Sequence, residues 1–245
     1  MAPAPPPQAS RPGDLEAGRP STAPSYNLAM QIVNLDIEGY LAALDPGDPP
    51  FARVAAEGEA LRLPIVNPAV GRFLEMLVIA TGTRRVLEIG TANGYSALWL
   101  ARSLPPDGEI FTMEIDPERA GLARGHFQEA GLAERVSVIV GDAARMAHKV
   151  AGPFDLIFND GDKLQYEPLL DRLVSLLRPG GVLVTDNVLW DGEVVPGLVT
   201  PPRREPADTA AIAAYNRRLA GDDRLATSFL PLRDGLAVSV RRKTS

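Results

Sequence analysis

Residues 85–96 read Arg-Val-Leu-Glu-Ile-Gly-Thr-Ala-Asn-Gly-Tyr-Ser. The first part of this segment is typical of a short buried strand, and the pattern predicts a helix from Ser96. Gly90 and Gly94 lie between them, and glycines let the backbone turn tightly and approach a ligand at the start of a helix. The spacing is not Gly-x-Gly-x-x-Gly, and no lysine follows as a phosphate-binding loop requires. An ordinary strand-to-helix turn is the alternative.

Outward from this segment, the chain alternates between the hydrophobic periods of strands and helices. Strands are expected at residues 85–89, 110–113, 136–140, 154–158, 182–185 and 236–240. Helices are expected at residues 70–81, from 96 onward, and at 117–130, about 167–177 and 208–220. This alternation predicts an α/β fold with a doubly wound, mostly parallel sheet and helices on both faces. Ligands of such sheets bind beyond the carboxyl ends of the strands.

The segments before the sheet differ in composition. Residues 1–24 are rich in proline and poor in large apolar side chains, so we expect a disordered tail. Residues 25–63 show a helical pattern with Leu28, Ile32 and Leu35 on one face, and a second short helix is expected from Phe51. This helical cover is too small for a domain of its own. The main domain is expected at residues 64–245.

Composition narrows the chemistry. The 245 residues include no cysteine, which excludes disulfide scaffolds, thiolate metal sites and cysteine nucleophiles. The net charge of −6 provides no electrostatic footprint for nucleic acid. No run of residues approaches the ~18 apolar residues of a membrane span, and the N-terminus does not resemble a secretory signal. We therefore expect a cytoplasmic, soluble protein that uses Asp, Glu, Asn, Lys and backbone groups.

Acidic residues end the first three expected strands. Glu88 suits a cationic or zwitterionic ligand better than a pyrophosphate. Glu114 follows Gly94 by twenty residues, where a carboxylate can accept both hydroxyls of a ribose, in NAD or in another adenosine ligand. Asp142 and the amide of Ala143 are candidates for contact with an adenine edge. Asp142 is equally well interpreted as a helix N-cap.

The next two strand ends carry a set of hard oxygen donors. Asp160 follows one strand, and Asp186 and Asn187 follow its expected neighbour. Two carboxylates and an amide without His or Cys suit Mg²⁺ or Ca²⁺. Lys163 is close enough in the chain to reach an atom bound there. The alternative interpretation is that these side chains cap turns and are solvated.

Three motifs resemble the S-adenosylmethionine-dependent O-methyltransferases of the caffeoyl-CoA and catechol type, which are cation-dependent. They are residues 86–98, residues 154–163 with Tyr166, and residues 177–192. The resemblance covers roughly residues 63–243. Asn159 and Gly161 depart from the family pattern, which usually has an apolar residue and an alanine there.

The resemblance implies a Rossmann-like methyltransferase fold and assigns roles to particular residues. S-adenosylmethionine would be held by Glu88, Gly90, Ser96, Glu114 and Ala143, with a backbone contact from Val66 and a further contact from Asp160. Asp160, Asp186 and Asn187 would bind Mg²⁺ or another divalent cation such as Ca²⁺ or Mn²⁺, and Lys163 would act as general base. It also implies a homodimer, and family members act on CoA thioesters, vicinal diphenols or hydroxylated uridine in tRNA.

These observations predict methyl transfer to a hydroxyl of a catechol-like small molecule, a class that includes caffeoyl-type acceptors. Trp190 and Tyr166 are expected to stack on the acceptor ring or to pack in the core. Residues 51–63 and 194–206 are expected to close over the acceptor. The alternatives are a tRNA hydroxyuridine methyltransferase, which a basic cluster near Arg203 favours, an NAD-dependent dehydrogenase and a non-catalytic cofactor-binding module.

Overall fold

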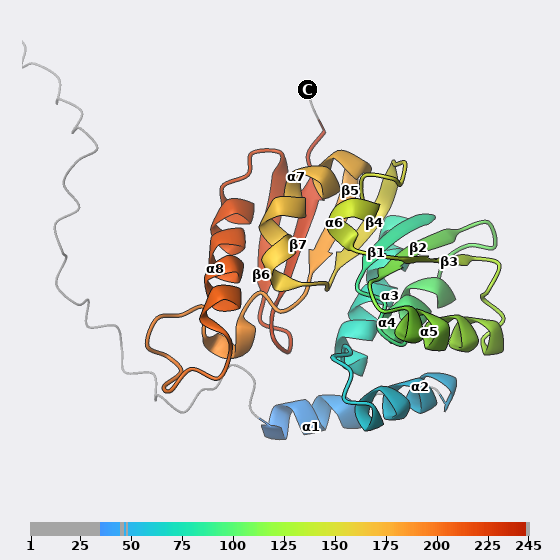
Figure 1. The fold of residues 1–245 in the computed structure, drawn as a ribbon, viewed down its shortest axis with the longest axis horizontal. Coiled ribbons are helices and arrows are strands. Elements are labelled where there is room, and N and C mark those ends of the chain that lie inside the picture. Colours follow the sequence, from blue (N-terminus) through green and yellow to red (C-terminus); the bar gives the residue numbers. More distant parts are fainter. Residues whose placement is uncertain (1–34, 45–46, 48, 244–245) are drawn as a thin grey trace, which may run out of the picture.

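The computed structural model describes residues 35–44, 47 and 49–243. Its centre is a seven-stranded sheet in the order β3-β2-β1-β4-β5-β7-β6 (Figure 1). Strands β1 to β5 pair in parallel, and β7 pairs antiparallel with β5 and β6. The strands are β1 (Arg85–Ile89), β2 (Glu109–Glu114), β3 (Val136–Val140), β4 (Phe154–Asn159), β5 (Leu177–Thr185), β6 (Leu225–Leu230) and β7 (Leu236–Arg241). The predicted doubly wound, mostly parallel sheet is confirmed.

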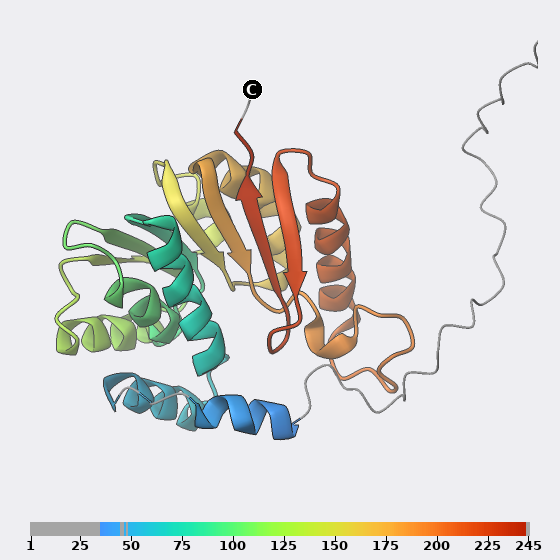
Figure 2. The ribbon, with the colours of Figure 1, turned by 180° about the vertical axis from the view of Figure 1, so that it is seen from behind.

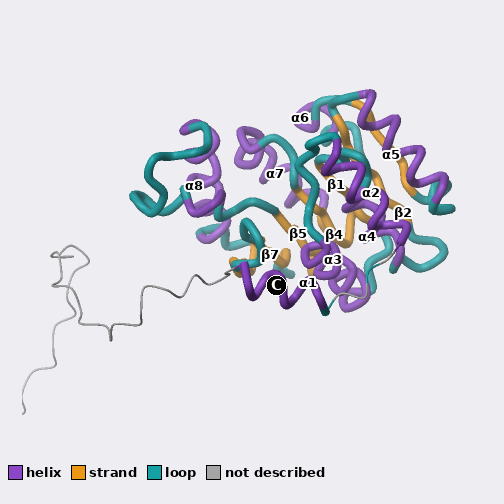
Figure 3. The backbone as a smooth tube through the Cα atoms, turned by 90° about the horizontal axis from the view of Figure 1, so that it is seen from below, coloured by secondary structure: helices purple, strands orange, loops and turns teal. Residues whose placement is uncertain are grey.

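Helices cover both faces of this sheet, as predicted. Seen from below in Figure 3, α6, α7 and α8 lie on one side of the strands, and α3 and α4 lie on the other. These helices, with α5, are α3 (Pro68–Thr81), α4 (Tyr95–Arg102), α5 (Pro117–Glu129), α6 (Ala143–Met146), α7 (Tyr166–Leu176) and α8 (Pro206–Ala220). Among the described residues, no helix has the length and apolar character needed to cross a membrane.

The core follows from the alternation of side chains along each strand. In β4, Leu156 and Phe158 belong to the apolar cluster beneath α3, α4 and α5, whereas Ile157 between them belongs to the cluster beneath α7 and α8. Val86 and Leu87 in β1 divide in the same way. The central strands are thus buried on both faces, which explains why they appear in the sequence as continuous apolar runs.

Short polar signals fix the helix ends. The side chain of Asn67 accepts a hydrogen bond from the amide of Val70 at the start of α3, and Gly82 ends that helix in the left-handed conformation. Asp116 caps α5 by accepting hydrogen bonds from the amides of Glu118 and Arg119. Asp116 is therefore the N-cap of α5.

The N-terminal cover is only partly within the described residues. It consists of α1 (Leu35–Ala43), which contacts α3, and α2 (Pro49–Ala60), which packs on α4 (Figure 2). The ring of Phe51 lies edge-on to Trp99 in α4, with their centroids 4.8 Å apart. The expected tail at residues 1–24 and the apolar positions Leu28 and Ile32 lie outside the described residues.

Strand β6 is absent from the sequence-based expectation. Its burial does not alternate regularly, since Leu225 is buried but most of the following residues are half-buried or exposed. The strand lies at the edge of the sheet and pairs only with β7. Weak patterning of this kind is common in edge strands, because only one neighbour and one face constrain them. The sequence analysis consequently does not predict the turn between β6 and β7, which lies at the same end of the sheet as the carboxyl ends of the parallel strands.

Two helical glycines provide a matched test of this packing. A Cβ added at Gly71 in α3 would lie 2.5 Å from the indole of the buried Trp99, whereas a Cβ at Gly121 in α5 would meet nothing within 4 Å. We expect Gly121→Ala to raise the free energy of unfolding by about 0.5–1 kcal/mol. Gly71→Ala should lower it by about 1–3 kcal/mol through overpacking. Urea denaturation of both variants checks this, and a stabilised Gly71→Ala protein would contradict the packing described.

Candidate active site

A cavity of about 950 Å³ lies at the carboxyl ends of the strands. It spans the point where the strand order reverses, because β2 lies on one side of β1 and β4 lies on the other. This is where doubly wound sheets bind ligands. The cavity has two halves: one is lined by the ends of β1, β2 and β3, and the other by residues that follow β4, β5 and β6.

The first half contains the glycine turn after β1. Gly90 has a φ of +94°, and a Cβ there would lie 2.4 Å from the backbone oxygen of Asp160. Only glycine permits this close approach. Gly94 has a φ of +88° and is the N-cap of α4, where a Cβ would lie 2.7 Å from the ring of Phe127. The two glycines therefore serve the tight turn and close contact that the sequence predicts, and Gly90 joins the two halves of the cavity.

Glu114 lines this first half and is held by the backbone. Its Oε2 accepts a hydrogen bond of 2.8 Å from the amide of Ala92, and its Oε1 accepts one of 3.0 Å from the amide of Asp116. The side chain is 5% exposed. Each carboxylate oxygen can accept a further bond. Glu114 is therefore oriented to receive donors from a ligand, such as the two hydroxyls of a ribose.

The predicted cofactor residues divide into two groups. Gly90, Glu114, Ala143 and Asp160 line the cavity. The structure does not bring the other predicted residues to the surface of this cavity: Val66, Glu88 and Ser96 are each at most 8% exposed, and Asp142 caps α6 by accepting a bond from the amide of Ala144. The N-cap interpretation of Asp142 is thus the one the structure supports.

Glu88 lies in the interior of β1, beneath the cavity floor. It has no exposed surface, and its Oε2 accepts a 2.5 Å hydrogen bond from the Thr112 hydroxyl. Burial raises the pKa of the Glu88 carboxyl to about 7, and hydrogen bonds from Ser96 and Thr112 offset part of this rise. Glu88 therefore belongs to the interior of the sheet and not to the cavity surface.

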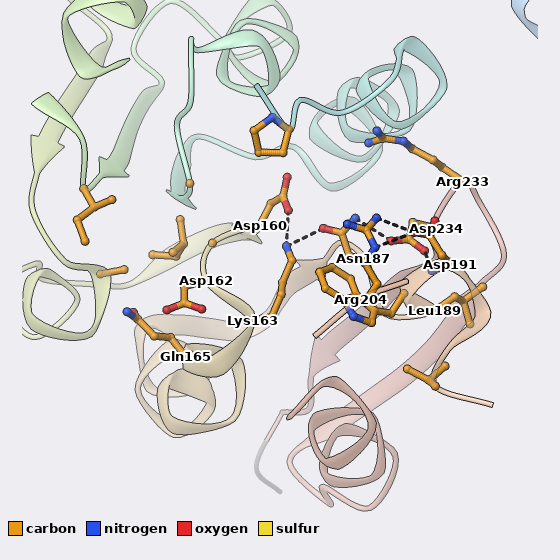
Figure 4. Close-up of a pocket in the computed structure, with 18 of the residues that line it drawn as sticks. Asp160, Asp162, Lys163, Gln165, Asn187, Leu189, Asp191, Arg204, Arg233 and Asp234 are labelled. Atoms are coloured by element: carbon orange, nitrogen blue, oxygen red, sulfur yellow. Dashed lines mark hydrogen bonds and ion pairs between the residues drawn. The ribbon is translucent and has the colours of Figure 1, made fainter. Parts of the chain in front are cut away.

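The second half of the cavity brings Lys163 together with two of the three predicted metal ligands, Asp160 and Asn187 (Figure 4). Lys163 begins the short helix η1 (Lys163–Gln165). Its Nζ donates hydrogen bonds to Oδ1 of Asp160 at 2.9 Å, to Oδ1 of Asn187 at 2.6 Å and to the Tyr166 hydroxyl at 2.8 Å. Oxygen atoms from the ends of β4 and β5 thus converge on one cation.

Asp186 has the environment of a group that lacks a partner. It is fully buried, and its Oδ1 accepts a 2.7 Å bond from the amide of Asn187. Its Oδ2 has no hydrogen-bond partner among the described residues. Burial, followed by the negative charge of Asp160, raises the pKa of Asp186 to about 7. A divalent cation would supply the missing partner.

The donor set therefore fits a hard cation. In the described part of the chain, no three His, Cys, Asp or Glu side chains gather as a metal site, so the amide oxygen of Asn187 would have to be the third ligand. That oxygen already faces a positive charge, the Lys163 ammonium, together with Asp160. Amide and carboxylate oxygens are ligands of Mg²⁺ and Ca²⁺.

Tyr166 is not available for stacking on the ring of an acceptor. It has no exposed surface, and its ring packs against Tyr215 with centroids 5.2 Å apart. Its hydroxyl accepts the bond from Lys163 and donates to the backbone oxygen of Asp186 at 3.1 Å. The prediction that Tyr166 stacks on substrate is therefore wrong, and core packing is correct. Tyr166 instead positions Lys163.

Trp190 does line the cavity. It begins the short helix η2 (Trp190–Gly192) and is 7% exposed. The guanidinium of Arg204 lies 4.6 Å from its ring centroid and forms a 2.6 Å ion pair with Asp191. Trp190 belongs to a mostly apolar surface that we call the apolar wall: Leu189, Trp190, Val194, Val195 and Leu198.

Of the two segments predicted to close over the acceptor, only one lines the cavity in the described structure. Residues of the 194–206 segment line the cavity, as predicted. Residues 51–63 do not line it, because α2 packs its apolar face on α4 instead. Only Pro64, just beyond that segment, reaches the cavity. The expectation that residues 51–63 close over an acceptor is therefore wrong for the described structure.

The turn between β6 and β7 supplies residues that the sequence analysis missed. Asp234 accepts a 3.2 Å bond from the Asn187 amide nitrogen and another from the backbone amide of Asp191. Burial raises the pKa of Asp234 above its ordinary value. Arg233 lines the cavity beside it. An Asp-Gly pair at residues 234–235 is a turn signal that could have located this hairpin, had β6 been recognised.

Gly161 shows why this chain departs from the alanine of the resembling family. A Cβ at Gly161 would lie 2.8 Å from Cγ2 of Ile89, which is buried at the end of β1. An alanine here would require Ile89 to shift. Local packing of Gly161 against Ile89 therefore accounts for the departure.

The raised pKa of Glu88 predicts a pH dependence of stability. Because the folded-state pKa of about 7 exceeds the ordinary value of 4.5, the protonated group stabilises the fold below pH 4.5, and this contribution is lost as the pH rises to about 7. Between pH 5 and 8, the free energy of unfolding should fall by about 2–3 kcal/mol more in the wild type than in Glu88→Gln. Urea titrations at both pH values check this, with Glu118→Gln as the surface control. Equal losses in wild type and Glu88→Gln would show that Glu88 ionises normally.

Comparisons with known proteins agree with this geometry. The sequence pattern of the O-methyltransferase family matches residues 53–243. A catechol O-methyltransferase of Mycobacterium tuberculosis is 39% identical over 183 residues, which are 73% of this chain and 80% of the relative. A catechol O-methyltransferase of Niastella koreensis is 34% identical over 71% of this chain and 81% of its own length.

Solved structures show the same architecture. An O-methyltransferase from Bacillus cereus in complex with SAH superposes with a TM-score of 0.76 at 32% identity, over 84% of this chain and 97% of that one. The O-methyltransferase TomG from Streptomyces achromogenes, in complex with SAM, has a TM-score of 0.76 at 30% identity, over 85% and 96% of the two chains. The resemblance carried by the three motifs is confirmed, and the chain belongs to the family of S-adenosylmethionine-dependent O-methyltransferases.

Proposed function

We propose that the protein transfers the methyl group of S-adenosylmethionine to one hydroxyl of a vicinal diphenol, with Mg²⁺ or another divalent cation such as Ca²⁺ or Mn²⁺ at Asp160, Asp186 and Asn187. One observation carries this proposal: a lysine amine and two hard oxygen donors, from Asp160 and Asn187, meet within hydrogen-bond distance in the same cavity as the glycine turn. The names of the curated relatives support a diphenol acceptor.

The first half of the cavity suits the methyl donor. Glu114 presents two carboxylate oxygens, already oriented by backbone amides, to the ribose hydroxyls. The turn at Gly90 lets the donor approach the backbone closely. The negative charge of Asp160 lies at the boundary of the two halves, where it attracts the sulfonium and ammonium groups. The complexes of relatives with SAH and SAM support this placement.

The second half suits the acceptor and its proton. A phenol with a pKa near ~10 is a weak nucleophile at neutral pH. A divalent cation, when bound, lowers the pKa of a hydroxyl that it ligates. In its neutral form, Lys163 accepts this proton on Nζ, which the Tyr166 hydroxyl holds in place. The phenolic oxygen then forms a bond to the methyl carbon as the carbon–sulfur bond breaks, which leaves a methyl ether and S-adenosylhomocysteine.

The alternatives fare differently. The NAD-dependent dehydrogenase is overturned by the family match over residues 53–243. For tRNA, two of the four arginines in the basic cluster at Arg203, Arg204, Arg217 and Arg218 are already paired: Arg204 with Asp191 and Arg218 with Asp171. This leaves less positive charge for phosphates, on which nucleic-acid affinity depends. We therefore favour a small-molecule acceptor, and we expect the homodimer that the resemblance implies.

Removal of the amine tests the role of Lys163. We expect Lys163→Ala to lower kcat by about 10²–10⁴-fold, because proton removal from the diphenol loses its base. The Kd for S-adenosylmethionine, measured by isothermal titration, should change by less than about threefold, since the amine belongs to the acceptor half of the cavity. An unaltered kcat would contradict the assignment.

Removal of a carboxylate tests the cation site directly. We expect Asp160→Ala to abolish the binding of Mn²⁺ and to lower activity to the background. Electron paramagnetic resonance in the absence of substrates measures the binding of Mn²⁺. Asp223→Asn, at an exposed position outside the cavity, is the matched control and should bind Mn²⁺ as the wild type does. Chelation with EDTA should abolish wild-type turnover, and Mg²⁺ should restore it. Full activity in EDTA would refute the metal requirement.

A further inference from the structure

Arg233 has features that the proposed reaction does not explain. It lies in the turn between β6 and β7 with a φ of +52°, a conformation that is uncommon for residues other than glycine. Its side chain lines the cavity, and in Figure 4 the guanidinium extends back over the cavity toward the side of Asp160. No hydrogen-bond or ion-pair partner for this guanidinium is found among the described residues, although two aspartates line the cavity nearby.

The other cations that line the cavity are already paired. Lys163 contacts Asp160, Arg204 contacts Asp191, and Arg119 lies 3.6 Å from Asp116. A guanidinium remains charged at every pH at which the protein is folded. Among the described residues that line the cavity, Arg233 is therefore a cation with no hydrogen-bond or ion-pair partner, and its charge acts only at longer range on the buried Asp186.

The nearby acids do not favour a cationic acceptor. Asp191 is neutralised by its ion pair with Arg204. Asp234 accepts hydrogen bonds from Asn187 and from the backbone of Asp191. Asp191 and Asp234 are thus engaged within the protein, and Asp186 has no exposed surface. The charge that a ligand meets at this rim is therefore the guanidinium of Arg233.

The apolar wall lies in the same half of the cavity as Lys163 and Arg233. Val195 and Leu198 in this wall are 50% and 66% exposed, so they offer apolar surface to a ring. A diphenol whose hydroxyls lie at Lys163 would rest its ring on the wall and direct its remaining substituent toward the rim. There the substituent would face the guanidinium of Arg233, which lines the same cavity.

We propose that Arg233 binds an acidic substituent of the acceptor, and that the preferred acceptor is a vicinal diphenol carrying a carboxylate. This inference rests on the proposed function. One planar guanidinium matches one carboxylate with two parallel hydrogen bonds. A CoA tail with several phosphates would need several free cations, and the neighbouring Arg204 is already paired.

Three acceptors of the same size and different charge test this directly: 3,4-dihydroxybenzoate, 3,4-dihydroxybenzyl alcohol and 3,4-dihydroxybenzylamine. In the presence of Mg²⁺ and S-adenosylmethionine, kcat/KM for the full-length enzyme should decrease from the anion to the alcohol to the amine. High ionic strength should raise KM for the benzoate and leave KM for the alcohol nearly unchanged, because the contact is near solvent.

Variants of Arg233 distinguish recognition of the acceptor's charge from a structural role of Arg233 in the site. Arg233→Gln should raise KM for the benzoate about tenfold or more, with kcat and the constants for the alcohol changed less than about twofold. Arg233→Lys should retain part of the preference, since it keeps the charge but loses the planar fork. Arg217→Gln in α8 removes the same charge at an exposed position outside the cavity, and all three acceptors should react as with the wild type.

Several outcomes would overturn the inference. Equal losses for all three acceptors in Arg233→Gln would mean that Arg233 supports the fold or the charge of Asp186, whose pKa its positive charge lowers. An unchanged preference in Arg233→Gln, with the alcohol still methylated, would refute the role of Arg233 and leave the proposed function intact. Failure of the wild type to methylate any of the three diphenols would refute both.

Discussion

The ammonium group of Lys163 holds the site together, because three separate segments direct oxygen atoms at it. Asp160 follows β4, Asn187 follows β5, and Tyr166 begins α7. Without a cation at this point, the negatively charged carboxylate of Asp160 would face the partially negative amide oxygen of Asn187, and the two would repel each other. A divalent cation can satisfy the same oxygens, and the buried Oδ2 of Asp186 has no other partner in the described structure. The site therefore has two ways to balance its charge, and the proposed reaction uses both the amine and the ion.

Most of this arrangement is predictable because it lies on parallel strands. Buried strands such as β1 and β4 appear as apolar runs, and parallel pairing brings their carboxyl ends to one edge. Residues at the carboxyl ends of the parallel strands are consequently placed in one cavity by topology alone: Glu114 ends β2, Asp160 follows β4 and Asn187 lies just after β5. The tight turn at Gly90 is equally predictable, and its close contact with the backbone of Asp160 leaves no room for a Cβ.

The remainder depends on contacts between segments that no local pattern encodes. An aromatic residue at position 166 suits a core and a binding surface alike, and only its packing on Tyr215 places it inside. The helical pattern of residues 51–63 is visible, but the partner of α2 is set by Trp99, which receives Phe51. Edge strand β6 has little hydrophobic alternation, so Arg233 and Asp234 arrive at the cavity on a hairpin that the sequence pattern does not indicate.

The most direct measurement of the central claim is anomalous diffraction from crystals grown with Mn²⁺ and S-adenosylhomocysteine. The account predicts a single strong anomalous peak in the cavity, bounded by Asp160, Asp186 and Asn187, with the Lys163 amine moved out from between the oxygens and directed toward the acceptor half. Absence of a peak there, with Lys163 still bonded to Asp160 and Asn187 beside bound S-adenosylhomocysteine, would contradict it.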